Sequence, residues 1–139
     1  MSFQLIPATQ EEADFINARI DVFNTAQLSF AGTQLERPLR YVMKEGDTII
    51  AGIDACFYLE SILYVHVLFI EESYRKKTLG SLLLKKVETE AKALGGTLVH
   101  LDTFDFQAKD FYLKHGYEVF GILEDCPKGH KRFYMRKTL

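Results

Sequence analysis

A predicted strand that leads through a basic turn into a predicted helix constrains this chain more than any other feature. The strand covers Ile62 to Ile70, the helix covers Leu79 to Leu94, and the turn carries the cations Arg75-Lys76-Lys77. The first N–H groups of a helix have no acceptor within the helix and lie at the positive end of its dipole, so a bound anion satisfies both. The junction therefore predicts a phosphate-binding turn, with a solvated charged loop as the alternative.

The two faces of this predicted strand differ in polarity. One face is wholly apolar and carries Leu63, Val65, Val67 and Phe69. The opposite face includes Tyr64 and His66. Because successive side chains of a strand point to opposite faces, and strands covered on both faces lie inside a sheet, we expect this strand at the sheet centre. The polar pair on a covered face marks a candidate site.

A second pattern lies downstream and has the form Ala-x-x-Phe-Tyr-x-x-x-Gly-Tyr, from Ala108 to Tyr117. Together with Arg75 and Gly80 at the start of the preceding helix, it resembles the GNAT superfamily of N-acetyltransferases. The resemblance covers about residues 62 to 123 well, and the first 60 residues only in the order of elements. It implies one domain over residues 1–139, with a mixed, mostly antiparallel α/β (α+β) sheet that is splayed at its centre and has helices on both faces.

Hydrophobic period and turn residues predict the remaining elements. Thr9 and Glu12 have the spacing of a capping box, which predicts a helix from there to about Phe23. The turn Glu45-Gly46-Asp47 favours a hairpin, because Gly and Asp accept the positive φ that tight turns need. The other expected elements are a strand near Phe3 to Ile6, hairpin strands at Leu39 to Lys44 and Thr48 to Leu59, a strand at Leu98 to Thr103, a helix at Gln107 to His115, and strands at Tyr117 to Leu123 and Lys131 to Lys137.

Two expectations concern the first 38 residues. The apolar stripe Phe15, Ile16, Ile20 and Phe23 of the first helix is expected to pack into the core. Asn24 to Pro38 has no clear period and reads as a loop or broken helix. Long surface loops are often functional, so we expect this segment to border the acceptor site.

Composition narrows the classes of function. A net charge of −2 gives no overall attraction to nucleic acid or to a membrane, so the basic turn is a local feature. Cys56 and Cys126 lack the spacing of a metal site or a disulfide framework, and Cys56 is expected to be a small core residue. We expect no metal, no export signal and no membrane span, and hence a cytoplasmic protein.

The resemblance implies an acetyl-CoA site. The pantetheine arm is expected to pair with the backbone of Leu68, Phe69 and Ile70. The diphosphate is expected on the turn and first helical residues: Arg75, Lys76, Lys77, Thr78, Leu79, Gly80 and Ser81, with Asp105 and Ala108 near the pantetheine. Thr78 stands where the family usually has glycine, and Asp105 stands where it commonly has Asn. A β-branched residue is costly at positive φ, and an ionised carboxylate cannot donate a hydrogen bond.

The resemblance also implies catalytic roles. Tyr112 matches the family tyrosine that donates its proton, or a hydrogen bond, to the leaving sulfur; a core tyrosine is the alternative. His66 matches a strand position where several members carry a base, and imidazole titrates in the useful range. Glu124, Asp125 and His130 are alternatives to His66 as the base, and the expected acceptor contacts are Tyr64, Glu124, Asp125 and His130.

The expected reaction moves an acetyl group from acetyl-CoA to an amine within a ternary complex. Carboxylates and an aromatic ring at the expected acceptor end favour a small cationic amine. A non-catalytic acyl-CoA-binding domain is the alternative that keeps the basic turn, and a dinucleotide-binding fold lacks its glycine-rich turn here. A homodimer is common in the family.

Overall fold

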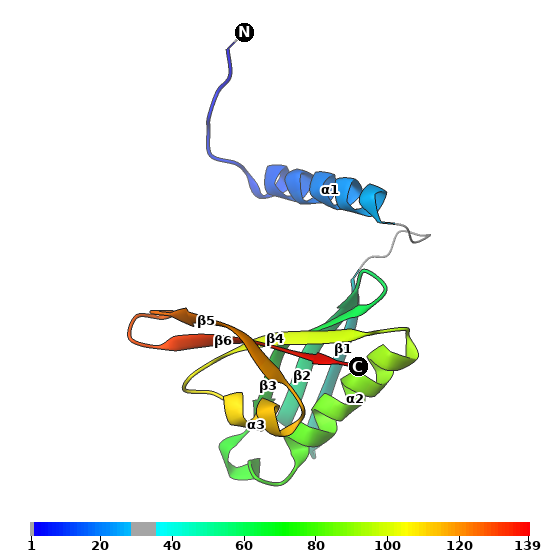
Figure 1. Cartoon of the computed structure of the whole chain (residues 1–139), viewed down its shortest axis with the longest axis vertical. Helices are drawn as coiled ribbons and strands as arrows, with labels where there is room; N and C mark the ends of the chain where they lie inside the picture. The colour runs from blue at the N-terminus through cyan, green and yellow to red at the C-terminus, as the bar shows by residue number, and fades with distance from the viewer. Residues whose placement is uncertain (1, 29–35) are drawn as a thin grey trace. The chain divides into compact units, whose positions relative to one another are not determined.

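The structure, a computed structural model, describes residues 2–28 and 36–139. The chain divides into two compact units, Met1–Thr33 and Gln34–Leu139. Each unit is described by itself (Figure 1).

The first unit consists of one helix and the segment before it. Helix α1 spans Gln10–Gln27, and the predicted capping box is confirmed. The Thr9 hydroxyl accepts from the Glu12 N–H at 3.2 Å, and the Glu12 carboxylate accepts from the Thr9 N–H at 2.9 Å. The predicted strand near Phe3 to Ile6 is wrong, because these residues form no strand and residues 2–28 offer no strand with which their backbone could pair.

The apolar stripe of α1 is not part of a core in this unit. None of the helix residues is buried, and Phe15 and Ile16 are more than 60% exposed. Within residues 2–28 a single helix has nothing to bury its stripe against, so the expected core packing stays a prediction. The helix also runs on through Asn24 to Gln27, and strand β1 begins at Arg37, so the predicted loop is shorter than expected at both ends. Residues 29–35 of that loop lie outside the described residues.

The second unit is built on a six-stranded sheet with the order β1-β2-β3-β4-β6-β5. All neighbouring pairs are antiparallel except β3 and β4, which confirms the expected mixed, mostly antiparallel class. The strands are β1 (Arg37–Glu45), β2 (Thr48–Tyr58), β3 (Ile62–Ile70), β4 (Leu98–Phe104), β5 (Glu118–Glu124) and β6 (Lys131–Thr138). The short helix η1 (Glu72–Tyr74) and helices α2 (Leu79–Ala93) and α3 (Lys109–Lys114) complete the unit.

Helix α2 covers the middle of the sheet. Its side chains Leu83, Leu84, Val87 and Ala91 are buried against the inward residues of β2 and β3. Burying each leucine stabilises the fold by about 1.5–3 kcal/mol. Helix α3 lies on the same side of the sheet in Figure 1, and its Tyr112 belongs to the same core.

A bulge at His66 divides β3 into two halves. Asp54 of β2 pairs with Val67 and Ala55 pairs with Val65, so His66 has no partner in β2. A bulge shifts the alternation of side chains by one residue. The predicted apolar face is therefore wrong beyond Val65: Val67 is 54% exposed, and Leu68 packs against the core instead.

Strands β3 and β4 pair only along their first halves. Ile62 to Val65 lie opposite Leu98 to Leu101, and β3 and β4 do not pair with each other beyond that point. The expected splay at the sheet centre is thus present. It leaves backbone groups of Leu68 to Ile70 free of a neighbouring strand on the β4 side.

The described residues also bear on the expectations for membrane spans, metal sites and cysteines. No helix in the described segments is long and apolar enough to cross a membrane. Within residues 2–28 and 36–139, no group of three or more metal-ligating side chains occurs. Cys56 is buried and unoxidised, as expected of a small core residue, and Cys126 is a free thiol as well.

Candidate functional site

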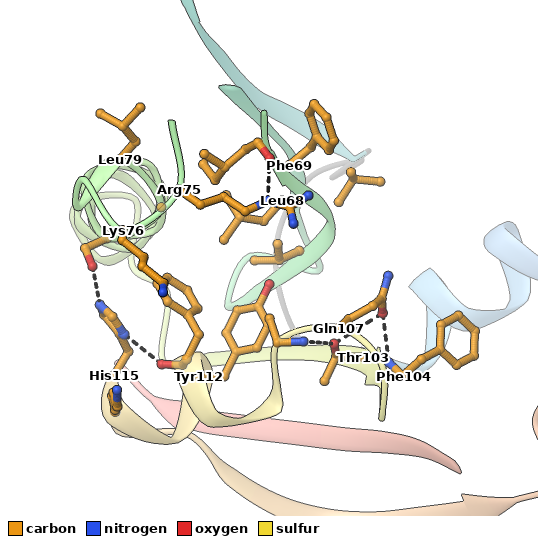
Figure 2. A pocket seen from close by; sticks show the side chains of 18 of the residues that line it. Leu68, Phe69, Arg75, Lys76, Leu79, Thr103, Phe104, Gln107, Tyr112 and His115 are labelled. Atoms are coloured by element: carbon orange, nitrogen blue, oxygen red, sulfur yellow. Dashed lines mark hydrogen bonds between the residues drawn. The ribbon is translucent and has the colours of Figure 1, made fainter. Parts of the chain in front are cut away.

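A cavity of about 730 Å³ fills the space where β3 and β4 diverge. Its walls come from the second half of β3, the turn before α2, the end of β4 and helix α3 (Figure 2). The cavity brings together twelve of the predicted site residues: His66, Leu68, Phe69, Ile70, Arg75, Lys76, Thr78, Leu79, Gly80, Ser81, Ala108 and Tyr112. The remaining six lie outside its lining: Tyr64, Lys77, Asp105, Glu124, Asp125 and His130.

The start of α2 presents free backbone N–H groups to this cavity. Leu82 is the first residue to donate to the turn at the helix start, to the Thr78 carbonyl at 3.1 Å. The N–H groups of Leu79, Gly80 and Ser81 precede that bond and have no acceptor within the helix. The cavity lining also includes the cations Arg75 and Lys76. Free donors, a helix dipole and two cations therefore border the same cavity, which suits an anion.

Thr78 adopts the positive φ that is costly for a β-branched residue. Its φ is 63° and its ψ is 8°, which is the left-handed region, and Lys76 also has a positive φ of 65°. A non-glycine residue held in such a region costs about 1–3 kcal/mol. The Thr78 hydroxyl donates to the Lys77 carbonyl at 2.5 Å, so it is occupied locally.

Gly80 is required by a close approach of two helices. A Cβ at this position would lie 3.2 Å from the Phe111 ring of α3. The first turn of α2 therefore packs directly on α3. This contact connects the anion-binding turn to the helix that carries Tyr112.

Arg75 ties the turn back to the end of β3. Its Nε donates to the Ile70 carbonyl at 3.1 Å, and Figure 2 shows this bond above the cavity. Lys77 points elsewhere, with its Nζ 5.3 Å from the centre of the Tyr74 ring. Of the three consecutive cations, two thus line the cavity and one does not.

Tyr112 extends from α3 into the cavity, and only 6% of the residue is exposed (Figure 2). Burial, and then the charge of Asp102, raise the pKa of its hydroxyl to about 12. Among the described residues, no hydrogen bond joins this hydroxyl to a protein acceptor. The hydroxyl therefore stays protonated at neutral pH and is available to donate to a ligand.

His66 lies in the bulge of β3 and is one of the residues that line the cavity. Its Nε2 lies 3.4 Å from the Cys56 sulfur, and its ring packs edge-on against Tyr64 with 4.5 Å between centroids. The Tyr64 hydroxyl donates to Asp102 at 2.8 Å, and burial with this bond raises the pKa of Tyr64 to about 12. Tyr64 thus lies behind the cavity lining, in contact with His66 and Asp102, which are both part of that lining.

None of the four predicted residues near the last hairpin lines the cavity, and three of them are held by hydrogen bonds elsewhere. Asp105 accepts from the Lys131 N–H at 2.8 Å and from His130 Nδ1 at 2.9 Å. The backbone bond is the main reason that the pKa of Asp105 is lowered. Asp125 accepts from the Gly129 N–H at 3.2 Å, and Glu124 is the exposed last residue of β5. Their predicted roles in binding have no support from this geometry.

Several lining residues were not predicted. Gln107 accepts from the Phe104 N–H at 2.8 Å and from the Thr103 hydroxyl at 3.2 Å, which fixes the end of β4 beside the cavity. No sequence pattern predicted these bonds of Gln107 to Thr103 and Phe104. His115 also lines the cavity, and its position beside the glycine that ends α3 could have suggested it.

Comparisons with known proteins agree with this fold. The model of the Acetyltransferase (GNAT) family matches residues 8–117. The crystal structure of an acetyltransferase from Bacillus cereus ATCC 14579 has a TM-score of 0.91 and 33% identity, covering 99% of this chain and 98% of that one.

Two curated relatives are similar in sequence. Blasticidin-S acetyltransferase from Streptomyces morookaense is 34% identical over 78 residues, which are 55% of this chain and 57% of that protein. An acetyltransferase from Agrobacterium fabrum is 25% identical over 138 residues, covering 99% and 98%. A match to the family model over most of the chain, including the turn and helix that build the cavity, shows that this chain belongs to the GNAT family of acetyltransferases.

Proposed function

We propose that this protein transfers the acetyl group of acetyl-CoA directly to the nitrogen of an amine, with both substrates bound at once. The observation that carries the proposal is that an anion-binding helix start and an unpaired tyrosine hydroxyl face the same cavity. A phosphate-binding turn alone would also fit a domain that binds acyl-CoA without reacting. A buried donor aimed into the cavity favours an enzyme.

The acetyl donor is acetyl-CoA. The diphosphate fits the free N–H groups at the start of α2 with Arg75 and Lys76 beside them. The pantetheine amides fit the edge of Leu68 to Ile70 that faces away from β2, where no strand pairs with β3 and they extend it as an added strand. A homologous fold, an aminoglycoside 6'-N-acetyltransferase, has been solved in complex with coenzyme A. The cavity volume lies within the range of ligand sites.

The chemistry follows from the groups at the splay. The amine attacks the thioester carbonyl, the carbonyl oxygen gains negative charge, and the sulfur leaves as a thiolate. Tyr112 donates to that sulfur as its charge develops, because its hydroxyl is protonated and has no protein acceptor in the described chain. His66 is the proposed base, since it is among the residues that line the cavity and an imidazole can take the proton of the attacking amine directly or through water.

The proposed acceptor is a small-molecule amine. The expectation of a cationic acceptor depended on Glu124 and Asp125, which do not line the cavity. Among the described lining residues, Asp102 is the one carboxylate, and it pairs with Arg132 at 2.6 Å. Charge at this end therefore gives a weaker preference for a cation than the sequence suggested, and the preference rests on Asp102.

A panel of amines tests the proposal. Aminoglycosides, other amino sugars, polyamines and acidic amino acids are each incubated with acetyl-CoA, and free thiol is measured together with the mass of the acceptor. The proposal expects one acetylated amine for each thiol released. Binding of acetyl-CoA with no acceptor acetylated by any member would favour the non-catalytic alternative.

A further inference from the structure

Ser81 and His115 join the start of α2 to the end of α3 by hydrogen bonds that the proposed reaction does not use. Nδ1 of His115 lies 2.9 Å from the Phe111 carbonyl oxygen, and Nε2 lies 2.9 Å from the Ser81 hydroxyl oxygen. The two dashed lines at His115 in Figure 2 mark these bonds. Ser81 and His115 both line the cavity, beside the N–H groups proposed to hold the diphosphate.

The direction of these two bonds follows from the donors available. A carbonyl oxygen can only accept, so Nδ1 must carry a hydrogen. In a neutral ring Nε2 is then an acceptor, and the Ser81 hydroxyl donates its single hydrogen to it. In this state Ser81 can accept from a neighbour but has no hydrogen left for a phosphate oxygen.

We propose that binding of the CoA diphosphate is coupled to uptake of one proton at Nε2 of His115. The protonated Nε2 donates to the Ser81 oxygen, and the hydroxyl hydrogen turns to donate to a phosphate oxygen. The proton comes from solvent, and no covalent bond to carbon, sulfur or phosphorus changes. The inference rests on the proposed function, because it requires the diphosphate at the start of α2.

The charges around the ring explain why proton and ligand bind together. A diphosphate stabilises an imidazolium through opposite charge, while the surrounding cations do not. Lys137 of β6 approaches the neighbouring Gly116 and pairs with a carboxylate of α2 at 3.0 Å. Of the charged groups on these elements, Arg75, Lys76 and Lys114 line the cavity together with His115, and Lys137 pairs with Glu88.

Calorimetry of CoA binding in buffers with different ionisation enthalpies measures the protons taken up. Near pH 7 the wild-type protein should take up as much as about one proton more per CoA than His115→Gln, which can still accept from Ser81 but cannot be protonated. CoA affinity should rise by up to about tenfold for each pH unit lowered, and this dependence should weaken in Ser81→Ala. His100→Gln is the matched control, because that histidine bonds to Tyr58 and lies outside the cavity lining.

The outcomes separate this inference from the proposed function. Equal proton uptake by wild type and His115→Gln, with CoA still bound, would overturn the coupling and leave the acetyltransferase proposal intact. No CoA binding by the wild type would overturn both. If His115→Gln does not fold, nitrogen NMR of the wild-type imidazole decides: CoA must convert Nε2 from an acceptor to a protonated nitrogen, and an unchanged signal overturns the coupling.

Discussion

Replacing Tyr112 by Phe separates a catalytic hydroxyl from a structural one. The hydroxyl has no protein acceptor among the described residues, so its removal should change the free energy of unfolding by less than about 0.5 kcal/mol. A hydrogen bond to a charged group contributes about 1.5–3 kcal/mol, and here the charge develops on sulfur in the transition state. That range corresponds to a kcat lowered about 10- to 150-fold, with the affinity for acetyl-CoA nearly unchanged.

Tyr117→Phe is the matched control. Tyr117 is also buried, its hydroxyl donates to Glu88 at 2.5 Å, and burial with this bond strongly raises its pKa. Its loss should lower the free energy of unfolding by about 1–3 kcal/mol and leave kcat unchanged. Denaturant unfolding and thiol release from acetyl-CoA measure the two effects. An unchanged kcat in Tyr112→Phe under conditions where chemistry limits turnover, or a destabilisation as large as that of Tyr117→Phe, would refute the catalytic assignment.

Three further changes follow from the same geometry. Thr78→Gly should raise the free energy of unfolding by about 1 kcal/mol, because glycine accepts the left-handed backbone conformation. Calorimetry should show that the affinity for acetyl-CoA is maintained or increased. Weaker binding would mean that the threonine side chain itself contacts the ligand. Asp105→Asn should lower the melting temperature at neutral pH. Because the pKa of Asp105 is lowered in the folded protein, its carboxylate stabilises the fold above the usual carboxyl pKa, and this stabilisation is lost as the pH falls through the folded pKa. The melting temperatures of the wild type and of Asp105→Asn should therefore converge as the pH falls below about 4. A difference that stays constant with pH would contradict the assignment. His66→Gln should flatten the acidic limb of the kcat/KM profile, and a preserved limb would exclude His66 as the base.

Most elements of the second unit could be predicted because each rests on a local signal. The turn Glu45-Gly46-Asp47 predicted the first hairpin, and Gly46 does have a positive φ of 60°. The alternation of β3 predicted its bounds, Ile62–Ile70, without error. The bulge at His66 carried no such signal, since it depends on how β2 and β3 pair, and it reversed the faces of Val67 and Leu68.

In the candidate site, too, the residues located by local sequence motifs were predicted and the others were not. Residues of the turn and of α3 were predicted because two spaced motifs locate them, and the cavity brings Gly80, Ser81 and Tyr112 together. The acceptor contacts were predicted only from charge near the chain's last hairpin. The expected place of Asp105 near the pantetheine has no support from the cavity lining, because its carboxylate accepts from the Lys131 N–H, which is distant in sequence and lies within 2.8 Å only in the folded chain.

A structure of the protein with bound acetyl-CoA tests the central claim most directly. We predict diphosphate oxygens on the N–H groups at the start of α2, pantetheine alongside Leu68 to Ile70, and the thioester sulfur within hydrogen-bonding distance of the Tyr112 hydroxyl. Acetyl-CoA bound away from the splay of β3 and β4, or a sulfur beyond the reach of Tyr112, would contradict it.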